Sequence, residues 1–144
     1  KKGVFSVQCT LNHSFNFLLK KEDKIEAWIL KNKKYFYAFL AGYTDAEGNI
    51  GVYNGIARYR VGTYDINILN QINSKLNTLG IFSRIHLDTP KNEKNKSDFW
   101  RVNVSAKESL LRLFNSMRPY LKHKKRLSDM QRAINNIKER NSLN

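Results

Sequence analysis

Two carboxylates stand close together where an apolar segment of the chain ends. Asp45 and Glu47 follow a run of aromatic and aliphatic residues, and Gly48 comes directly after them. The chain has three scattered histidines and one cysteine, which do not provide a zinc site of nitrogen and sulfur ligands. Any metal must therefore be held by oxygen atoms, which hard divalent cations prefer. Glu47 is the first candidate for such a ligand.

The charge of the chain indicates what such a site would act on. Lys and Arg total 26 against 12 Asp and Glu, so the net charge is +14 and the pI about 10.0. A charge of this size implies a polyanionic partner. With 41% hydrophobic residues, the chain is also too rich in core-forming side chains for a disordered basic tail. No segment has the pattern of a membrane span or a signal peptide, so we expect an intracellular protein without a membrane partner.

Hydrophobic periodicity predicts the elements that position these residues. Helices are predicted over 22–31, 34–45, 65–79, 106–116 and about 122–140. Strands are predicted within 49–62, 81–87 and 99–105. Asn54-Gly55 divides the segment 49–62 into a hairpin. The order predicts an α+β fold with an antiparallel four-stranded sheet, covered by helices on one face and free on the other. We expect Trp28 and Trp100 in the core.

The predicted free face of the sheet carries side chains of types that bind DNA. Polar or basic residues alternate with the apolar positions of the strands, and the predicted DNA-binding set is Asn49, Gly51, Tyr53, Arg58, Arg60, Arg84, His86, Arg101 and Asn103. In a major groove, Arg reads guanine and Asn reads adenine, while lysines contact phosphates. An ordinary solvated face is the alternative for any one strand, but several such strands on a chain of this charge favour DNA contact.

Small side chains on the predicted 34–45 helix indicate a contact with a second helix. Ala38, Ala41 and Gly42 share one helical face, so a second copy of the helix can approach closely there. That contact would bring Glu47 of each copy next to the symmetry axis. Two neighbouring carboxylates repel one another, and divalent cations relieve the repulsion while bringing metal to a phosphate.

Residues 40–48 read Leu-Ala-Gly-Tyr-Thr-Asp-Ala-Glu-Gly and resemble the motif of the LAGLIDADG homing endonuclease family. Six of the nine positions are identical, and Glu47 replaces Asp conservatively. The similarity in the order and spacing of elements runs from about residue 34 to 126, so we expect residues 1–33 to be an N-terminal extension packed on an endonuclease domain of residues 34–144. The resemblance implies a site-specific enzyme that cleaves double-stranded DNA by divalent-metal-dependent phosphodiester hydrolysis.

The resemblance also implies roles for single residues in the metal site. The Glu47 carboxylate and the Ala46 backbone carbonyl would bind Mg²⁺ or Mn²⁺, which would activate water and stabilise the leaving oxygen. Asp45 is implied to be a structural residue near the helix–helix, or dimer, interface. The segment Gly62-Thr63-Tyr64 departs from the family, which often has a polar residue there that holds a water network.

A basic segment further along the chain is similar to the family's Pro-aromatic-Leu-Lys-x-Lys segment. It begins at Pro119, and the resemblance places Lys124 in the active site with Lys122 close by. A basic residue near the scissile phosphate would stabilise negative charge or position the attacking water. The alternative for this segment is a solvated helix start that touches only phosphates.

A single motif supplies only half of a metal site, so we expect a symmetric homodimer on a palindromic or nearly palindromic DNA site. The chain begins without Met, so a C-terminal half that works with a second LAGLIDADG half in a longer protein stays open. Two other functions stay open on the same fold. One is an RNA maturase, in which Glu47 is dispensable, and the other is a non-catalytic DNA-binding protein. Binding without metal-dependent cutting would distinguish either from a nuclease.

Overall fold

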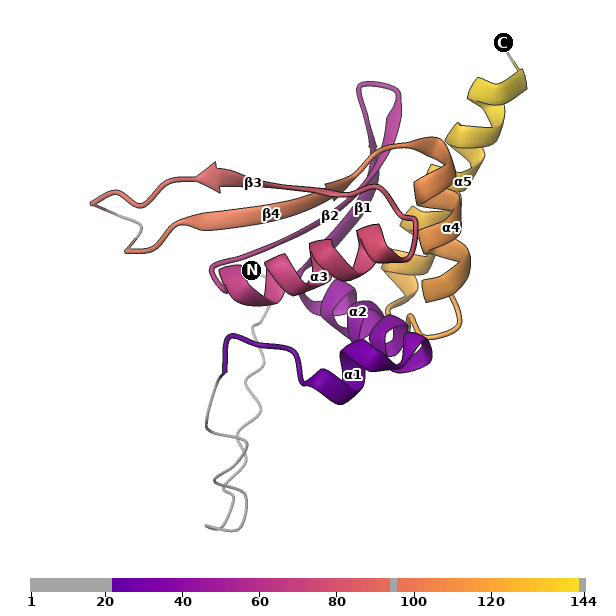
Figure 1. Ribbon diagram of the computed structural model, residues 1–144. Helices are drawn as coiled ribbons and strands as arrows, with labels where there is room; N and C mark the ends of the chain where they lie inside the picture. The colour runs from indigo at the N-terminus through magenta and orange to yellow at the C-terminus, as the bar shows by residue number, and fades with distance from the viewer. Residues whose placement is uncertain (1–21, 94–95, 143–144) are drawn as a thin grey trace, which may run out of the picture.

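The computed structural model describes residues 22–93 and 96–142, and in them it has one sheet with helices packed on it. The helices are α1 (Ala27–Lys31), α2 (Lys33–Glu47), α3 (Ile66–Thr78), α4 (Lys107–Met117) and α5 (Lys124–Ser142), and the strands are β1 (Gly48–Tyr53), β2 (Ile56–Thr63), β3 (Arg84–Thr89) and β4 (Phe99–Val104). The helices lie on one side of the sheet and leave the other side open (Figure 1). The predicted α+β class is confirmed.

The four strands form one antiparallel sheet in the order β1-β2-β4-β3, which puts β1 and β3 at its edges. Asn54 and Gly55 join β1 to β2, and both have positive φ angles, 50° and 73°. Two successive residues of positive φ form the turn whose twist matches that of a hairpin. The hairpin predicted from Asn54-Gly55 is therefore confirmed.

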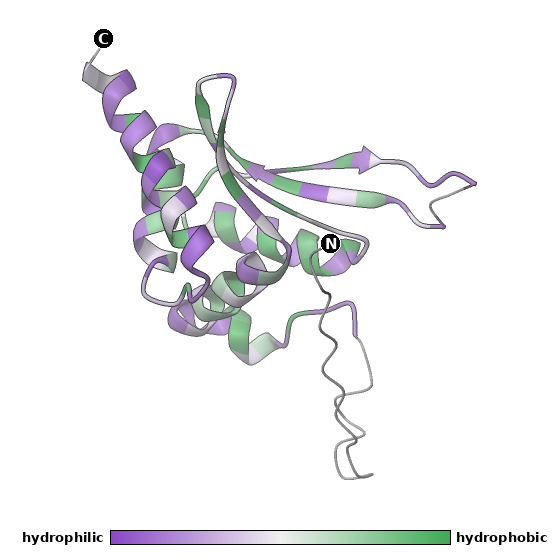
Figure 2. Ribbon diagram, turned by 180° about the vertical axis from the view of Figure 1, so that it is seen from behind, coloured by the Kyte–Doolittle hydropathy of each residue, from purple (hydrophilic) through white to green (hydrophobic). Residues whose placement is uncertain are grey.

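The hydrophobic core lies between the sheet and the helices. Ala57, Tyr59 and Val61 of β2 are buried, and so are Val102 and Val104 of β4. Hydrophobic and hydrophilic residues alternate along the strands, as Figure 2 shows, because successive side chains of a strand point to opposite faces. One face of the sheet thus supplies the core, and the other is left to polar residues. Within the described residues, no helix is long and apolar enough to span a membrane.

The first predicted helix is much shorter than expected. Only Ala27–Lys31 is helical, and the residues before it are held against α3 in a non-helical conformation. The Asp23 carboxylate accepts hydrogen bonds from the backbone N–H groups of Asn67 and Ile68, in the first turn of α3. The N–H of Ile25 donates to Gln71 of the same helix at 2.6 Å. The part of the expected N-terminal extension that precedes residue 22 lies outside the described residues.

The two tryptophans occupy different environments. Trp100 is half-buried against the core, but the prediction that Trp28 is a core residue is wrong, because 59% of its surface is exposed. Trp28 instead meets the exposed ring of Tyr35 edge to face, with the ring centroids 5.5 Å apart. Helix α1 has five residues and none of them is buried, so Trp28 does not reach the core.

The end of α2 is crowded where Gly48 lies against Thr44, one helical turn earlier. A Cβ atom on Gly48 would lie 2.6 Å from Cα and 2.7 Å from the carbonyl oxygen of Thr44, so only glycine fits there. Gly48 has an extended conformation, with φ −82°, and its N–H donates to that same carbonyl. The glycine therefore does not serve as a left-handed helix cap. It lets the chain turn directly from α2 into β1.

A buried hydrogen-bond pair joins the same helix end to β2. The Thr44 hydroxyl donates to the Leu40 carbonyl at 2.6 Å and shares a hydrogen bond of 2.9 Å with the hydroxyl of Tyr59. Tyr59 is fully buried, and burial raises the pKa of its hydroxyl above the ordinary value. The last turn of α2 is thus anchored to the centre of the sheet.

We expect Gly48→Ala to destabilise the fold, because the added methyl group would have to push against the Thr44 backbone. The expected loss in the free energy of unfolding is about 1–3 kcal/mol, as for other overpacked sites. The control is Gly42→Ala in the middle of the same helix, where an added Cβ would have nothing within 4 Å. In dilute, monomeric protein this control should gain about 0.5–1 kcal/mol. Urea unfolding followed by circular dichroism measures both, and equal effects would contradict the account.

Candidate nucleic-acid interface and metal site

The strand register arranges the predicted DNA-binding residues in rows across the open face of the sheet. Asn49 of β1 is paired with Arg60, Arg60 with Asn103 of β4, and Asn103 with Arg84 of β3. Paired residues point to the same face of a sheet. This row therefore crosses all four strands on the face opposite the core.

The other predicted residues fall on the same face. Arg101 of β4 stands between Gly62 of β2 and His86 of β3, and Gly51 is paired with Arg58. Tyr53 shares the face of Asn49 and Gly51 because the side chains of a strand alternate with a period of two. Sequence alternation thus predicted the composition of this face, and the register supplies the neighbour relations that the sequence does not state.

Several of these side chains are held in place by contacts within the face. The guanidinium of Arg60 lies 4.2 Å from the centre of the Tyr53 ring, and the Tyr53 hydroxyl donates to the side-chain oxygen of Asn49. The guanidinium of Arg84 lies 5.0 Å from the centre of the Phe82 ring. Such contacts reduce the number of conformations that a long side chain loses when it binds a partner.

Asp88 belongs to the same face and was not among the predicted site residues. Its carboxylate lies 2.7 Å from Nη1 of Arg101 and 4.0 Å from Nε2 of His86. The alternation Arg84, His86, Asp88 in β3 was a usable signal for its orientation. An acidic side chain is not of the basic or amide types that indicate DNA binding, so the residue type did not mark Asp88 as part of the site.

Glu47 lies at a pocket on this side of the molecule. It is the last residue of α2 and is exposed. The pocket has a volume of ≈160 Å³ and is lined by Glu47, Asn49, Tyr53, Arg60, Gly62, Phe99 and Arg101. The structure therefore brings the predicted metal ligand together with two of the predicted DNA-binding arginines. Phe99 was not among the predicted site residues, and Gly62 was named only as part of the segment that departs from the family. The two residues are closely packed, because a Cβ on Gly62 would lie 2.7 Å from the Phe99 ring.

The electrostatics of the α2 terminus favour a bound cation. The last turn of α2 contains Asp45 and Glu47 and no basic residue. The carboxyl end of a helix carries partial negative charge, which repels carboxylates and attracts cations. The Ala46 carbonyl lies in this last turn, where carbonyl groups have no partner within the helix. Carboxylate and carbonyl oxygens together match the donors that Mg²⁺ binds.

Asp45 links α2 to the start of α5. Its Oδ2 atom accepts hydrogen bonds from the backbone N–H groups of Lys122 at 2.9 Å and His123 at 3.3 Å. Asp45 thus makes a structural contact within one chain, and its place at a dimer interface stays a prediction. Lys122 and Lys124 are exposed on this anchored segment, and neither lines the Glu47 pocket.

The described part of one chain does not supply a complete set of side-chain ligands for a metal. Within the described residues, no group of three or more His, Cys, Asp or Glu side chains lies close enough together to hold a metal ion. A cation at Glu47 therefore needs further oxygen ligands from water, from a phosphate or from another protein chain.

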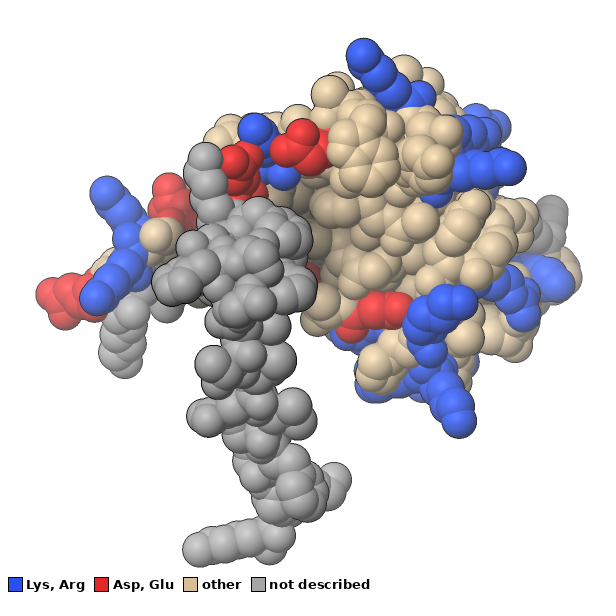
Figure 3. Space-filling model, turned by 90° about the horizontal axis from the view of Figure 1, so that it is seen from below, with Lys and Arg blue, Asp and Glu red and all other residues tan. Residues whose placement is uncertain are grey.

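The exposed face of α2 differs in part from the predicted contact face. Tyr35, Ala38 and Gly42 are exposed and follow one another at spacings of three and four residues, as expected for one helical face, and Asp45 is half-buried. Ala41 is fully buried in the core of its own chain, so it adds nothing to this surface. Viewed from below, the molecular surface around α1 and α2 is largely uncharged, with Lys and Arg gathered towards its rim (Figure 3).

Comparisons with known proteins agree with this geometry. A family model described as a LAGLIDADG-like domain matches residues 36–118, and no curated protein matches the sequence. Two similar solved structures show the homing endonuclease I-CvuI, one with the I-CreI target, uncleaved in 2 mM Mg, and one with its own target in 2 mM Ca. Their TM-scores are 0.55 and 0.53 at 20% and 19% identity, and both likenesses cover 74% of this chain and 68% of the other.

At such identities, the likeness to solved structures shows the fold, while the family match spans more than half of the chain. The match includes most of α2 with Glu47, all four strands and α4. The resemblance inferred from residues 40–48 is therefore confirmed, and this chain belongs to the LAGLIDADG homing endonuclease family.

Proposed function

We propose that this protein is a site-specific endonuclease that hydrolyses phosphodiester bonds of double-stranded DNA with the help of divalent cations held at Glu47. The observation that carries the proposal is the position of Glu47. Its carboxylate is exposed at the negative end of α2, beside a pocket lined by Arg60 and Arg101. Both arginines belong to the basic face of the sheet. A metal ligand thus borders the surface that binds the phosphodiester chain.

The oxygen donors at the end of α2 fit Mg²⁺ or Mn²⁺. Glu47 and the Ala46 carbonyl would hold the cation, and phosphate oxygens and a second chain would complete its ligands. When bound, the metal supplies Lewis-acid stabilisation and an activated water. Arg60 and Arg101 hold the phosphate next to the carboxylate, and Lys124, with Lys122, offsets the negative charge that develops on the phosphate.

We further propose that two copies of the chain pair through the exposed face of α2. The contact uses Ala38 and Gly42, with Tyr35 at one end and Asp45 at the other, and excludes Ala41 because that residue is buried in its own core. Pairing would place the Glu47 carboxylates of both copies near the symmetry axis of the dimer. Each copy would then supply a metal ligand that the other copy lacks. A second LAGLIDADG half in a longer protein would serve the same purpose.

The open face of the sheet is the proposed DNA-reading surface. The row Asn49, Arg60, Asn103 and Arg84 crosses all four strands, and Arg101 and His86 lie in the next row. With Arg60 and Arg101 on the phosphate, Asn49, Asn103, Arg84 and His86 are left to read bases. Bidentate contacts of Arg with guanine and of Asn with adenine each discriminate by about 1–3 kcal/mol. In a symmetric dimer, both half-sites would be read by the same row of residues.

Glu47→Gln should abolish cutting while preserving DNA binding, because glutamine keeps the shape of the side chain and removes the charge that holds the metal. We expect the rate of Mg²⁺-dependent cleavage to fall by about 100-fold or more. Cleavage and affinity are to be measured on a duplex first selected from a random pool by binding to the protein. The matched control, Glu139→Gln, removes an exposed carboxylate of α5 and should cut normally. Undiminished cutting by Glu47→Gln would overturn the assignment.

Gly42→Ala should weaken the dimer although it does not disturb the single chain. The methyl group meets nothing within 4 Å in one chain, so any loss of association must come from contact with a second helix. We expect the dimer dissociation constant to rise about tenfold, which corresponds to an overpacking cost within the usual range. Sedimentation equilibrium measures the constant. An unchanged dimer would place the interface elsewhere.

A further inference from the structure

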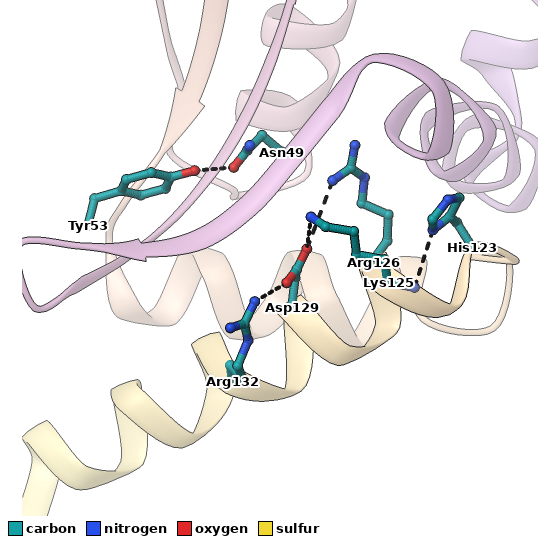
Figure 4. Close-up of polar contacts among 7 residues, drawn as sticks. All are labelled: Asn49, Tyr53, His123, Lys125, Arg126, Asp129 and Arg132. Carbon is teal, nitrogen blue, oxygen red and sulfur yellow. Dashed lines mark hydrogen bonds and ion pairs between the residues drawn. The ribbon is translucent and has the colours of Figure 1, made fainter. Parts of the chain in front are cut away.

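A cluster of four charged side chains on α5 is not used by the site described above. Asp129 is nearly fully buried, with 2% of its surface exposed. It accepts hydrogen bonds from Lys125 at 3.0 Å and from Arg132, and Nη1 of Arg126 lies 3.9 Å from its Oδ2 atom. Figure 4 shows the carboxylate between these three basic side chains, beside the strand that carries Asn49 and Tyr53. One carboxylate therefore faces three cations.

The cluster lies along a groove between α5 and the edge strand β1. The groove has a volume of ≈290 Å³ and is lined by Asn49, Ile50, Gly51, Val52, Tyr53, Lys125, Asp129 and Arg132. Asn49 and Tyr53 also line the Glu47 pocket, so the groove and the pocket adjoin one another. A nucleic-acid strand that leaves the pocket along β1 would pass the basic side chains of α5.

Both walls of the groove are held in position. Near the start of α5, Asp45 binds the backbone of Lys122 and His123. Further along, the Asn136 side chain accepts a hydrogen bond from the N–H of Ala57 and donates to the carbonyl of Gly55, at the tip of the β1–β2 hairpin. The width of the groove is thus set by contacts on both sides of the cluster.

The groove contains more positive charges than the one carboxylate of Asp129 can neutralise. Three cations around one carboxylate leave a local charge of +2, and repulsion between neighbouring cations is unfavourable unless an anion joins them. Burial acts to raise the pKa of Asp129, but its hydrogen bonds to Lys125 and Arg132 outweigh burial and lower the pKa, so the carboxylate stays ionised at neutral pH. The side chains of Lys125 and Arg132 are 66% and 71% exposed, so both can reach a further anion.

We propose that Lys125 and Arg132 bind a backbone phosphate of double-stranded DNA in the groove between β1 and α5, and that Asp129 is the positioning residue that orients them. This inference rests on the proposed function, since it names a further phosphate contact for the same DNA. Asp129 fixes the two long side chains before binding, which lowers the conformational entropy that they lose on contact with phosphate. Arg126, whose side chain is only 17% exposed, supports the carboxylate from the inner side.

Salt titrations of DNA affinity test the phosphate contact. The probe is a fluorescently labelled DNA duplex of mixed sequence without added metal, and the readout is the slope of log K against log [salt]. Each phosphate contact contributes about −0.9 to this slope. We therefore expect the double variant Lys125→Ala/Arg132→Ala to reduce its magnitude by about 1, and each single variant to account for part of that reduction. The matched control Lys138→Ala, an exposed lysine of α5 outside the groove, should leave the slope unchanged.

Asp129→Asn tests the positioning role, because charge and positioning predict opposite results. Removing one negative charge would tighten DNA binding if Asp129 acted only through the net charge. We expect weaker binding, since the ordered side chains are released, and a smaller loss when Arg132→Ala is already present. Glu139→Gln removes an exposed carboxylate of the same helix and should not weaken binding. Urea unfolding confirms that each variant is folded under the binding conditions.

The outcomes separate this inference from the proposed function. If the unmodified protein binds DNA but the slope is the same for Lys125→Ala, Arg132→Ala and Lys138→Ala, the phosphate site is wrong and the nuclease assignment stands. If Asp129→Asn binds as tightly as the unmodified protein or more tightly, the positioning role is wrong. If the unmodified protein shows no salt-dependent DNA binding, both proposals fall together.

Discussion

The close contact of Gly48 with Thr44, one helical turn before it, is the contact on which the rest of this structure depends. It ends α2 at Glu47 and starts β1 within one residue, so the carboxylate proposed to bind metal and the first strand of the proposed DNA-reading face share one fixed point. The buried hydrogen bond between Thr44 and Tyr59 holds this point against the centre of the sheet. Any shift of the helix along the sheet would move Glu47 away from Arg60 and Arg101. The close contact at the end of α2 thus sets the geometry of a charged site.

The few carboxylates of this strongly basic chain have separate positioning tasks. Among the described residues, four aspartates each hold a basic group or a helix start: Asp23 at α3, Asp45 at α5, Asp88 at Arg101, and Asp129 at Lys125 and Arg132. Removing a carboxylate from water costs free energy unless its hydrogen bonds are satisfied. Backbone N–H groups and guanidinium groups supply those hydrogen bonds here. Glu47 differs because it stands exposed at the negative end of a helix. Its environment favours a cation from outside the chain.

The sequence predicted the features that depend on local pattern. Alternation along the strands identified the open face, Asn54-Gly55 identified the hairpin, and the motif at residues 40–48 identified the family. Features that depend on which elements meet in space could not be predicted. Small residues such as Ala41 fit equally well against a second helix or the chain's own core, and the helical spacing is the same in both cases. The pairing of Asp88 with Arg101 likewise depends on a strand register that the spacing does not fix.

The most direct test of the account is cleavage of a randomised library of double-stranded DNA in the presence of Mg²⁺, followed by sequencing of the cut ends. The account predicts metal-dependent cuts in both strands at one sequence, with two related half-sites about a common centre. Binding to the library without cuts in either Mg²⁺ or Mn²⁺ would contradict it, and would turn the assignment to an RNA maturase or a non-catalytic DNA-binding protein on the same fold.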